Sequence, residues 1–178
     1  MNIMVTGHRP NGMPGRYGYT ISNEAWTKLQ QKFEEVIEQY TADKNEKTVT
    51  LITGMALGVD QVFWNAANEL REEYPDVYKI EAAVPFKGQE SKWFAASQRE
   101  YRRMLDNSDE VTIVSPGCYS AAKMDIRNRY MVDKSDLVIG VCCKNTGGTA
   151  NCLKYAKSKH KDICVINPDT LDIQFFKG

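Results

Sequence analysis

The chain has 178 residues and carries no net charge, with 23 Lys and Arg against 23 Asp and Glu. We expect a single α/β domain over 1–178, and the 42% apolar content is enough for a buried core. Zero net charge excludes a bulk attraction to nucleic acid or to a membrane surface. The sequence has no apolar run of about 18 residues, so we expect no membrane-spanning segment.

The amino terminus and the cysteines both favour a cytoplasmic location. Residues 1–6 resemble a first strand, without the basic start and long apolar stretch of a signal peptide. The five cysteines are odd in number and lack the spacing of a zinc site, so we expect a reducing compartment and no metal. Cys142, Cys143 and Cys164 lie in apolar strand-like runs, where a thiol is usually a small core residue. We expect no bound cofactor.

Short apolar runs alternate with longer helical patterns along the chain. Ser22 is the expected N-cap of the first helix. Almost uniformly apolar strands that alternate with helices predict a three-layer Rossmann-like α/β sandwich, with a mainly parallel sheet of about six strands. The expected strands are 2–6, 48–53, 78–84, 110–114, 137–142 and 163–166, and the expected helices are 22–40, 56–73, 89–105, 119–133 and 148–158.

Glycine-bearing loops follow several predicted strands, and ligands of open parallel sheets bind outside the carboxyl ends of the strands. Glycine lets backbone N–H groups approach a phosphate, and a following helix adds unpaired amides and a positive dipole end. Gly147-Gly148-Thr149 is the best candidate, with a plain helix cap as the alternative. Several such loops at one edge favour a ligand site. Its expected members at the strand ends are Thr6, Gly7, His8, Arg9, Thr53, Gly54, Met55, Pro85, Phe86 and the loop 144–149.

Charged side chains near these loops have both functional and structural interpretations. Arg9 suits a bidentate contact with phosphate or carboxylate. His8 suits a contact with a base or ribose, or a cap of its turn, more than general acid–base catalysis. Asp60 is expected either to bind a ribose hydroxyl or hold the first loop, or to be a solvated acid at a helix start. Arg127 is expected to point into the same crevice, whereas Trp93 is more typical of a core residue than of a base-stacking one.

The motifs together resemble the YpsA-like (YspA-like) branch of the SLOG superfamily, from Met1 to about Ile166. The resemblance implies a Rossmann-like fold, a nucleotide or nucleotide-derived ligand, and a homo-dimer or larger oligomer. Relatives include the LOG phosphoribohydrolases and the DNA-processing DprA proteins. The matching segments are Thr6-Gly7-His8-Arg9-Pro10, 52–60, 127–133 and Gly147-Gly148-Thr149-Ala150-Asn151.

The similarity to the LOG enzymes supports a ligand site but argues against their reaction. Arg127 falls at the position of the LOG helix arginine, whereas Cys152 falls at the position of the LOG catalytic glutamate. A thiol does not replace a carboxylate that must stay ionised to activate water or stabilise an oxocarbenium-like centre. Asp60 is the alternative acid, although nothing in the sequence shows that it substitutes.

The sequence therefore favours a module that senses, carries or sequesters a nucleotide-type small molecule. One alternative is a hydrolase of an N-glycosidic or phosphoribosyl bond, with Arg127 and Asp60 as candidate catalytic residues. The other is a single-stranded DNA-binding protein, which the zero net charge and the lack of a basic stripe interleaved with aromatics disfavour. Tyr17, Tyr19 and Trp93 are expected to form an exposed apolar patch suited to self-association.

Overall fold

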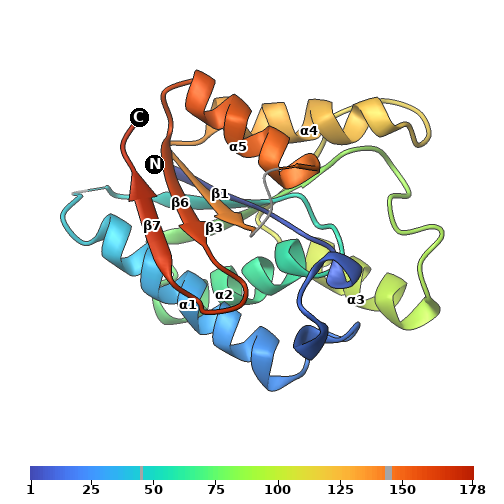
Figure 1. Ribbon diagram of the computed structural model, residues 1–178. Coiled ribbons are helices and arrows are strands. Elements are labelled where there is room, and N and C mark those ends of the chain that lie inside the picture. Colours follow the sequence, from blue (N-terminus) through green and yellow to red (C-terminus); the bar gives the residue numbers. More distant parts are fainter. Residues whose placement is uncertain (45, 143–145) are drawn as a thin grey trace.

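The computed structural model describes residues 1–44, 46–142 and 146–178. Over these residues the chain forms one sheet with helices packed on both of its faces (Figure 1). The strands are β1 (Asn2–Gly7), β2 (Val49–Thr53), β3 (Tyr78–Val84), β4 (Glu110–Ile113), β5 (Leu137–Val141), β6 (Asp162–Ile166) and β7 (Ile173–Phe176). The helices are α1 (Glu24–Thr41), α2 (Val59–Glu73), α3 (Ala95–Asp106), α4 (Ala121–Lys134) and α5 (Gly148–Ser158), with short 3-10 turns at Pro10–Gly12 and Gly15–Tyr17.

The sheet confirms the predicted Rossmann-like sandwich and adds a strand to it. The strand order is β4-β3-β2-β1-β5-β6-β7, and every neighbouring pair is parallel except β6 and β7. The expected count of about six strands is one short, because the final segment turns back after β6 and pairs antiparallel with it. The chain runs outward from β1 to β4 and then returns to place β5 beside β1. A topological switch point therefore lies between β1 and β5.

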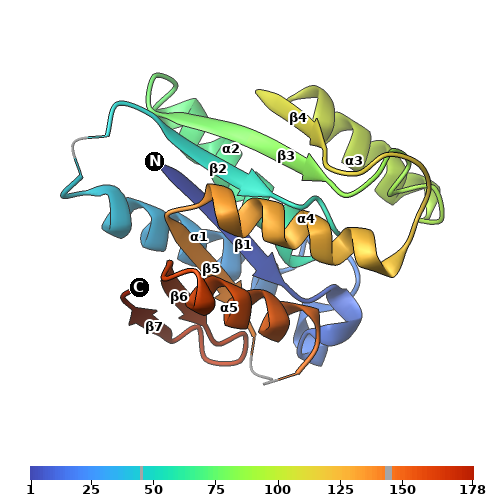
Figure 2. The ribbon, with the colours of Figure 1, turned by 90° about the horizontal axis from the view of Figure 1, so that it is seen from above.

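Two helical layers of different size enclose the sheet. Helices α1, α2 and α3 lie on one side, and α4 and α5 lie on the other (Figure 2). The larger core cluster fills the space under α1 and α2 and includes the fully buried Trp26, Phe33 and Phe63. The smaller cluster lies under α4 and α5. Apolar strand residues thus contribute to both cores, which explains their nearly uniform hydrophobicity.

Helices α1, α2, α3 and α4 begin two to six residues later than the sequence pattern predicts. The expected start of α2 at residue 56 is replaced by Val59, because Gly58 has a φ of 89° and interrupts helical geometry. The expected helix from residue 89 begins only at Ala95, after a series of turns. At α1 the N-cap is Asn23 and not Ser22, since the Asn23 side chain accepts a hydrogen bond from the Trp26 amide at 3.3 Å.

The expected exposed patch of Tyr17, Tyr19 and Trp93 is not present. Tyr17 is only 1% exposed, and its ring meets that of Trp26 edge-on at 4.7 Å. Trp93 is half-buried against Tyr101, with ring centroids 5.3 Å apart. Only Tyr19 is exposed as expected. In the long first loop, the Tyr17 ring therefore anchors the loop, whereas the Tyr19 ring stays at the surface.

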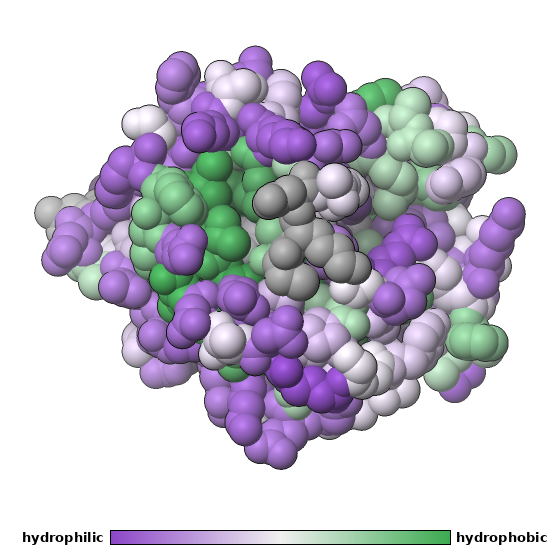
Figure 3. Space-filling model, in the orientation of Figure 1, coloured by the Kyte–Doolittle hydropathy of each residue, from purple (hydrophilic) through white to green (hydrophobic). Residues whose placement is uncertain are grey.

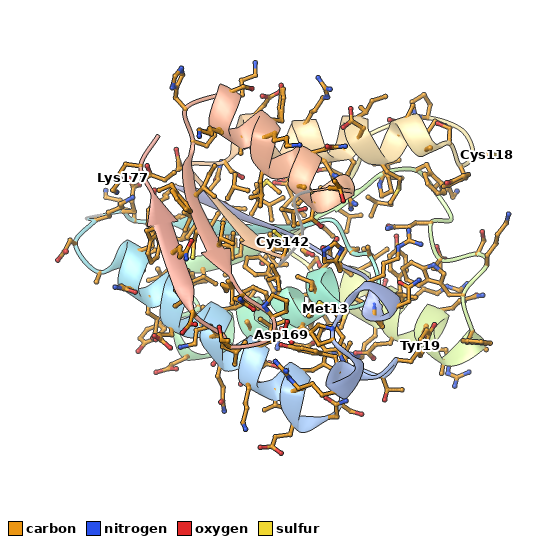
Figure 4. All side chains as sticks on the ribbon, in the orientation of Figure 1. Met13, Tyr19, Cys118, Cys142, Asp169 and Lys177 are labelled. Carbon is orange, nitrogen blue, oxygen red and sulfur yellow. The ribbon has the colours of Figure 1, made fainter. Side chains whose placement is uncertain are left out.

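The first loop is also fastened to the last turn of the chain. The Tyr17 hydroxyl donates a hydrogen bond to the Pro168 carbonyl oxygen at 2.7 Å. The Arg16 guanidinium donates to the same oxygen and to the Asp169 carbonyl oxygen. Asp169 and Met13 accordingly lie at the same end of the molecule (Figure 4). The turn that joins β6 and β7 thus supports the loop that follows β1.

Two further expectations concern the cysteines and the membrane. Cys164 is fully buried in the larger core, as predicted, while Cys142 is only half-buried. Cys143 lies outside the described residues. Among the described residues, the helices are too short or too polar to cross a bilayer.

Candidate functional site

The switch point brings together the ends of segments that are far apart in the sequence. Gly7 ends β1, and a Cβ atom there would lie 2.6 Å from the Cβ of Val59, the first residue of α2. A Cβ atom on Gly58, just before that helix, would lie 2.9 Å from the Pro10 ring. Glycine at both positions is what allows the first loop and the start of α2 to pack so closely.

A buried ion pair lies behind these loops. The Arg127 guanidinium on α4 and the Asp60 carboxylate on α2 are 3.8 Å apart, with side chains 5% and 7% exposed. Arg127 therefore reaches the loop after β2, where it contacts the Gly54 carbonyl oxygen, and Asp60 is not a solvated acid at a helix start. Burial raises the pKa of Asp60, with Arg127 opposing it, and burial likewise lowers the pKa of Arg127. Both directions show that desolvation outweighs the attraction within the pair.

Residues at the end of β2 and in the loop after it form hydrogen bonds with Asp60. The Ala56 amide donates to the carboxylate at 3.2 Å, and the Thr53 hydroxyl donates to the Asp60 carbonyl oxygen at 2.7 Å. Met55 is fully buried and has a φ of 61°, in the left-handed region that a non-glycine residue seldom occupies. Such local strain is found where the surrounding structure fixes a loop, often at functional sites.

The Gly54 carbonyl oxygen joins the ion pair to residues that the sequence pattern does not single out. It accepts hydrogen bonds from Arg127 and, at 3.3 Å, from the buried side chain of Gln89. Tyr101 in turn donates to Gln89 at 3.4 Å. A Cβ at position 54 would collide with the Arg127 guanidinium, so glycine is required for this contact. The helical pattern hides Gln89 within a regular helix, although the preceding Gly88 is a signal of a turn.

Cys152 lies in the same cluster. Burial raises the pKa of its thiol to about 11, while a hydrogen bond with the Thr6 hydroxyl and the charge of Arg127 oppose that shift. The position that resembles the LOG glutamate is thus close to Arg127, but it holds a protonated thiol at neutral pH. The structure gives this side chain no means to act as an ionised carboxylate.

The amino end of α5 provides backbone donors at this edge. Gly147 precedes the helix with a φ of 97°, and both Gly147 and Gly148 are exposed. Thr149 is buried, so its hydroxyl is not displayed at the surface. The first amides of a helix have no partner within it. Lys144 and Asn145, which complete the predicted loop, lie outside the described residues.

The remaining predicted site residues differ in their surroundings. Arg9 is exposed, and its charge acts on both Asp60 and Arg127. His8 is half-buried, and its carbonyl oxygen accepts the Val59 amide at 3.4 Å. Pro85 and Phe86 are buried after β3, and the Phe86 ring packs edge-on against Tyr119 at 5.7 Å. The fold therefore brings Arg9, Asp60 and Arg127 within electrostatic reach of one another. The Phe86 ring makes an aromatic contact with Tyr119.

The sheet and its switch point define a Rossmann-like α/β protein. Residues 3–171 match the model of the YspA SLOG family, and the chain belongs to that family. The chain is 35% identical to the uncharacterised SPbeta prophage-derived protein YoqJ of Bacillus subtilis over 89% of this chain and 100% of the relative. It is 29% identical to a UPF0398 protein of Halalkalibacterium halodurans, over 96% of this chain and 89% of that one.

A solved structure supports the fold. The DNA processing protein A (DprA) of Streptococcus pneumoniae superposes with a TM-score of 0.60 over 96% of this chain. The identity is 16%, and this chain spans about half of that one, 52% of its length. The comparison therefore establishes a shared fold.

Proposed function

We propose that this protein binds a nucleotide or nucleotide-derived phosphate ligand at the carboxyl ends of β1 and β5, where the strand order reverses. The observation that carries the proposal is the exposed amino end of α5, where Gly147 and Gly148 leave the first helix amides uncovered by side chains. Helix amides and the helix dipole at such an end favour an anion. Arg9 adds an exposed positive charge, whereas the charge of the buried Arg127 is balanced by Asp60. A phosphate group fits this combination.

A variant at Gly148 tests the proposal directly. Among the described residues no atom lies within 4 Å of where a Cβ at this position would be, so a side chain is accommodated there. Gly148→Glu places a negative charge in the first turn, where it stabilises the helix but repels a phosphate. Gly148→Gln has nearly the same size without the charge. We expect Gly148→Glu to weaken ligand binding much more than Gly148→Gln.

Thermal unfolding is measured by calorimetry in the presence of candidate ligands. These are AMP, NAD, ADP-ribose, cyclic nucleotides and inorganic phosphate. A ligand at a hundred times its dissociation constant stabilises a protein by about 2.7 kcal/mol. Arg9→Ala should reduce that stabilisation, whereas Arg99→Ala, which removes an exposed arginine on α3, should not. The proposal fails if no compound in this panel stabilises the protein, or if the two Gly148 variants bind equally well.

A second candidate function is hydrolysis of an N-glycosidic or phosphoribosyl bond. The raised pKa of Asp60 favours it, because a carboxyl group that titrates closer to neutrality is a better general acid or base. Turnover of AMP or NAD by the wild-type protein, lost in Asp60→Asn with ligand binding retained, would support it. Binding without turnover would exclude hydrolysis and leave ligand binding as the function.

A further inference from the structure

A groove of about 850 Å³ lies between α5 and the hairpin of β6 and β7, on a face of the sheet and separate from the Asp60–Arg127 pair. Its floor is apolar and contains Leu153, Ile163, Val165 and Phe176. In the β6–β7 pairing Ile163 is directly opposite Phe176, so both side chains project from the same face of the sheet. Figure 3 shows this surface as a hydrophobic area bordered by hydrophilic residues.

The rim of the groove is basic. The described residues that line it include Lys154, Lys157, Lys161 and Lys177, and none of these lining residues has an acidic side chain. A countercharge lies just outside the lining at Asp162, whose carboxylate is 3.0 Å from Lys177. An occupant of this groove would therefore meet an apolar surface and a concentration of positive charge together. Such a pairing is complementary to a molecule with an apolar side and acidic flanks.

The layer to which α5 belongs ends beside this groove. Helices α4 and α5 cover their face of the sheet up to β6, and β7 extends beyond them (Figures 1 and 2). Phe176 is 52% exposed as a result. In an α/β sandwich the usual cover of such a strip is an amphipathic helix packed beside its neighbour. The geometry thus favours a helical occupant.

We propose that this groove docks an acidic amphipathic helix of a partner protein. The helix would place its apolar stripe on the floor of the groove and its Asp and Glu side chains against the lysines of α5. A second copy docked through the same face would bring the two lysine rims together, which like-charge repulsion disfavours. A bilayer surface is also a poor fit, since Ile163 is only 7% exposed at the bottom of the groove.

The test uses synthetic peptides with the 178-residue chain. One peptide of about 15 residues carries leucines at helical spacing with glutamates on the other positions. A second peptide has the same composition in scrambled order, and a third has lysines in place of the glutamates. We expect only the first to bind, with NMR amide shifts confined to α5, β6 and β7. Binding should weaken as salt is added.

Two variants and their matched controls localise the interaction. Lys154→Glu combined with Lys157→Glu should weaken binding of the first peptide about tenfold or more. Phe176→Ser should also weaken it. Phe94→Ser removes a ring that is 72% exposed before α3, and Lys79→Glu combined with Lys92→Glu changes charge elsewhere. These controls should bind as the wild type does.

The proposal is overturned if the scrambled or lysine peptide binds as well as the first one. Equal loss of affinity in the control variants would overturn it too. Anionic phospholipid vesicles that bind the protein when the first peptide does not would identify the groove as a lipid surface instead. A dimer in light scattering that Phe176→Ser dissolves would identify it as an interface between copies of this chain.

Discussion

The Nη1 atom of Arg127 and the Oδ2 atom of Asp60 lie 3.8 Å apart, although neither side chain is more than 7% exposed. Replacing a buried ion pair with apolar residues is often neutral or stabilising, whereas removing one partner is strongly destabilising. The pKa of Asp60 is raised and that of Arg127 is lowered, so each charge is disfavoured by its burial. A pair of this kind contributes little to net stability, which is consistent with a role in binding.

Arg127→Met should destabilise the protein at neutral pH. The substitution leaves the Asp60 carboxylate buried without its cation, which costs about 3 kcal/mol or more. The pKa of Asp60 is raised in the folded protein, so its protonated form favours folding. This contribution to the stability of the fold is complete below the ordinary carboxyl pKa and is lost as the pH rises through the raised value. The deficit of the variant, measured by urea unfolding, should therefore shrink as the pH is lowered.

Adding Asp60→Asn to Arg127→Met should restore most of the lost stability at neutral pH. The second substitution removes the unpaired buried charge and keeps a side chain of similar shape. The double variant should also lose the acid-dependent recovery seen in the single variant. If the double variant were as unstable as the single one at every pH, the unpaired carboxylate would not be the cause.

Gly54→Ala should destabilise the protein by about 1–3 kcal/mol, the usual cost of overpacking a buried site. The new Cβ would collide with the Arg127 guanidinium and lie 2.8 Å from the Asp60 carboxylate. Gly15→Ala is the matched control, because its Cβ has no described atom within 4 Å. Thermal unfolding of the two variants should differ clearly. Similar melting temperatures would show that Arg127 moves aside without cost.

The Cys152 thiol should resist alkylation in the folded protein. With a pKa of about 11, only about 0.1% of this thiol is ionised at pH 8, and the side chain is 4% exposed. Cys118 is exposed and should react first. Mass spectrometry after iodoacetamide treatment, with and without urea, measures both sites. Modification of Cys152 at the rate of Cys118 without urea would contradict the buried placement.

Asn23→Ala should lower stability by about 1 kcal/mol, the typical value for loss of an N-cap. The side chain caps α1 and also donates to the Tyr17 carbonyl oxygen, so the first loop should loosen as well. Ser22→Ala provides the comparison, since the cap is one residue later than the sequence pattern indicates. Equal effects of the two substitutions on urea unfolding would show that the cap is shared.

The sequence predicts regular elements and loop positions well because both depend on local chemistry. Helix α5 begins at Gly148 and ends at Ser158, as the glycine and the apolar spacing indicate. Strand β7 escapes prediction, because its pairing with β6 depends on a contact across the turn at residues 167–172. Periodicity alone does not reveal such an edge strand.

The candidate site is predicted less completely than the fold. The loops with Gly7, Gly54 and Gly147 are identified, since glycine at a strand end is visible in the sequence. The burial of Asp60 and its contact with Arg127 depend on how α2 and α4 pack, which no local pattern encodes. The expectation that Tyr17 lies at the surface is wrong for the same reason: its partner, Pro168, is 151 positions away.

The hydrogen bonds of Arg16 and Tyr17 to the turn at Pro168 and Asp169 have a consequence for energetic communication within the molecule. The loop that carries Arg9 is anchored to the hairpin whose other end, at Phe176, forms the floor of the basic-rimmed groove. If ordering one end also orders the other, an occupant of the groove changes the affinity of the loop for its ligand. By thermodynamic reciprocity, that ligand then changes the affinity of the groove by the same factor.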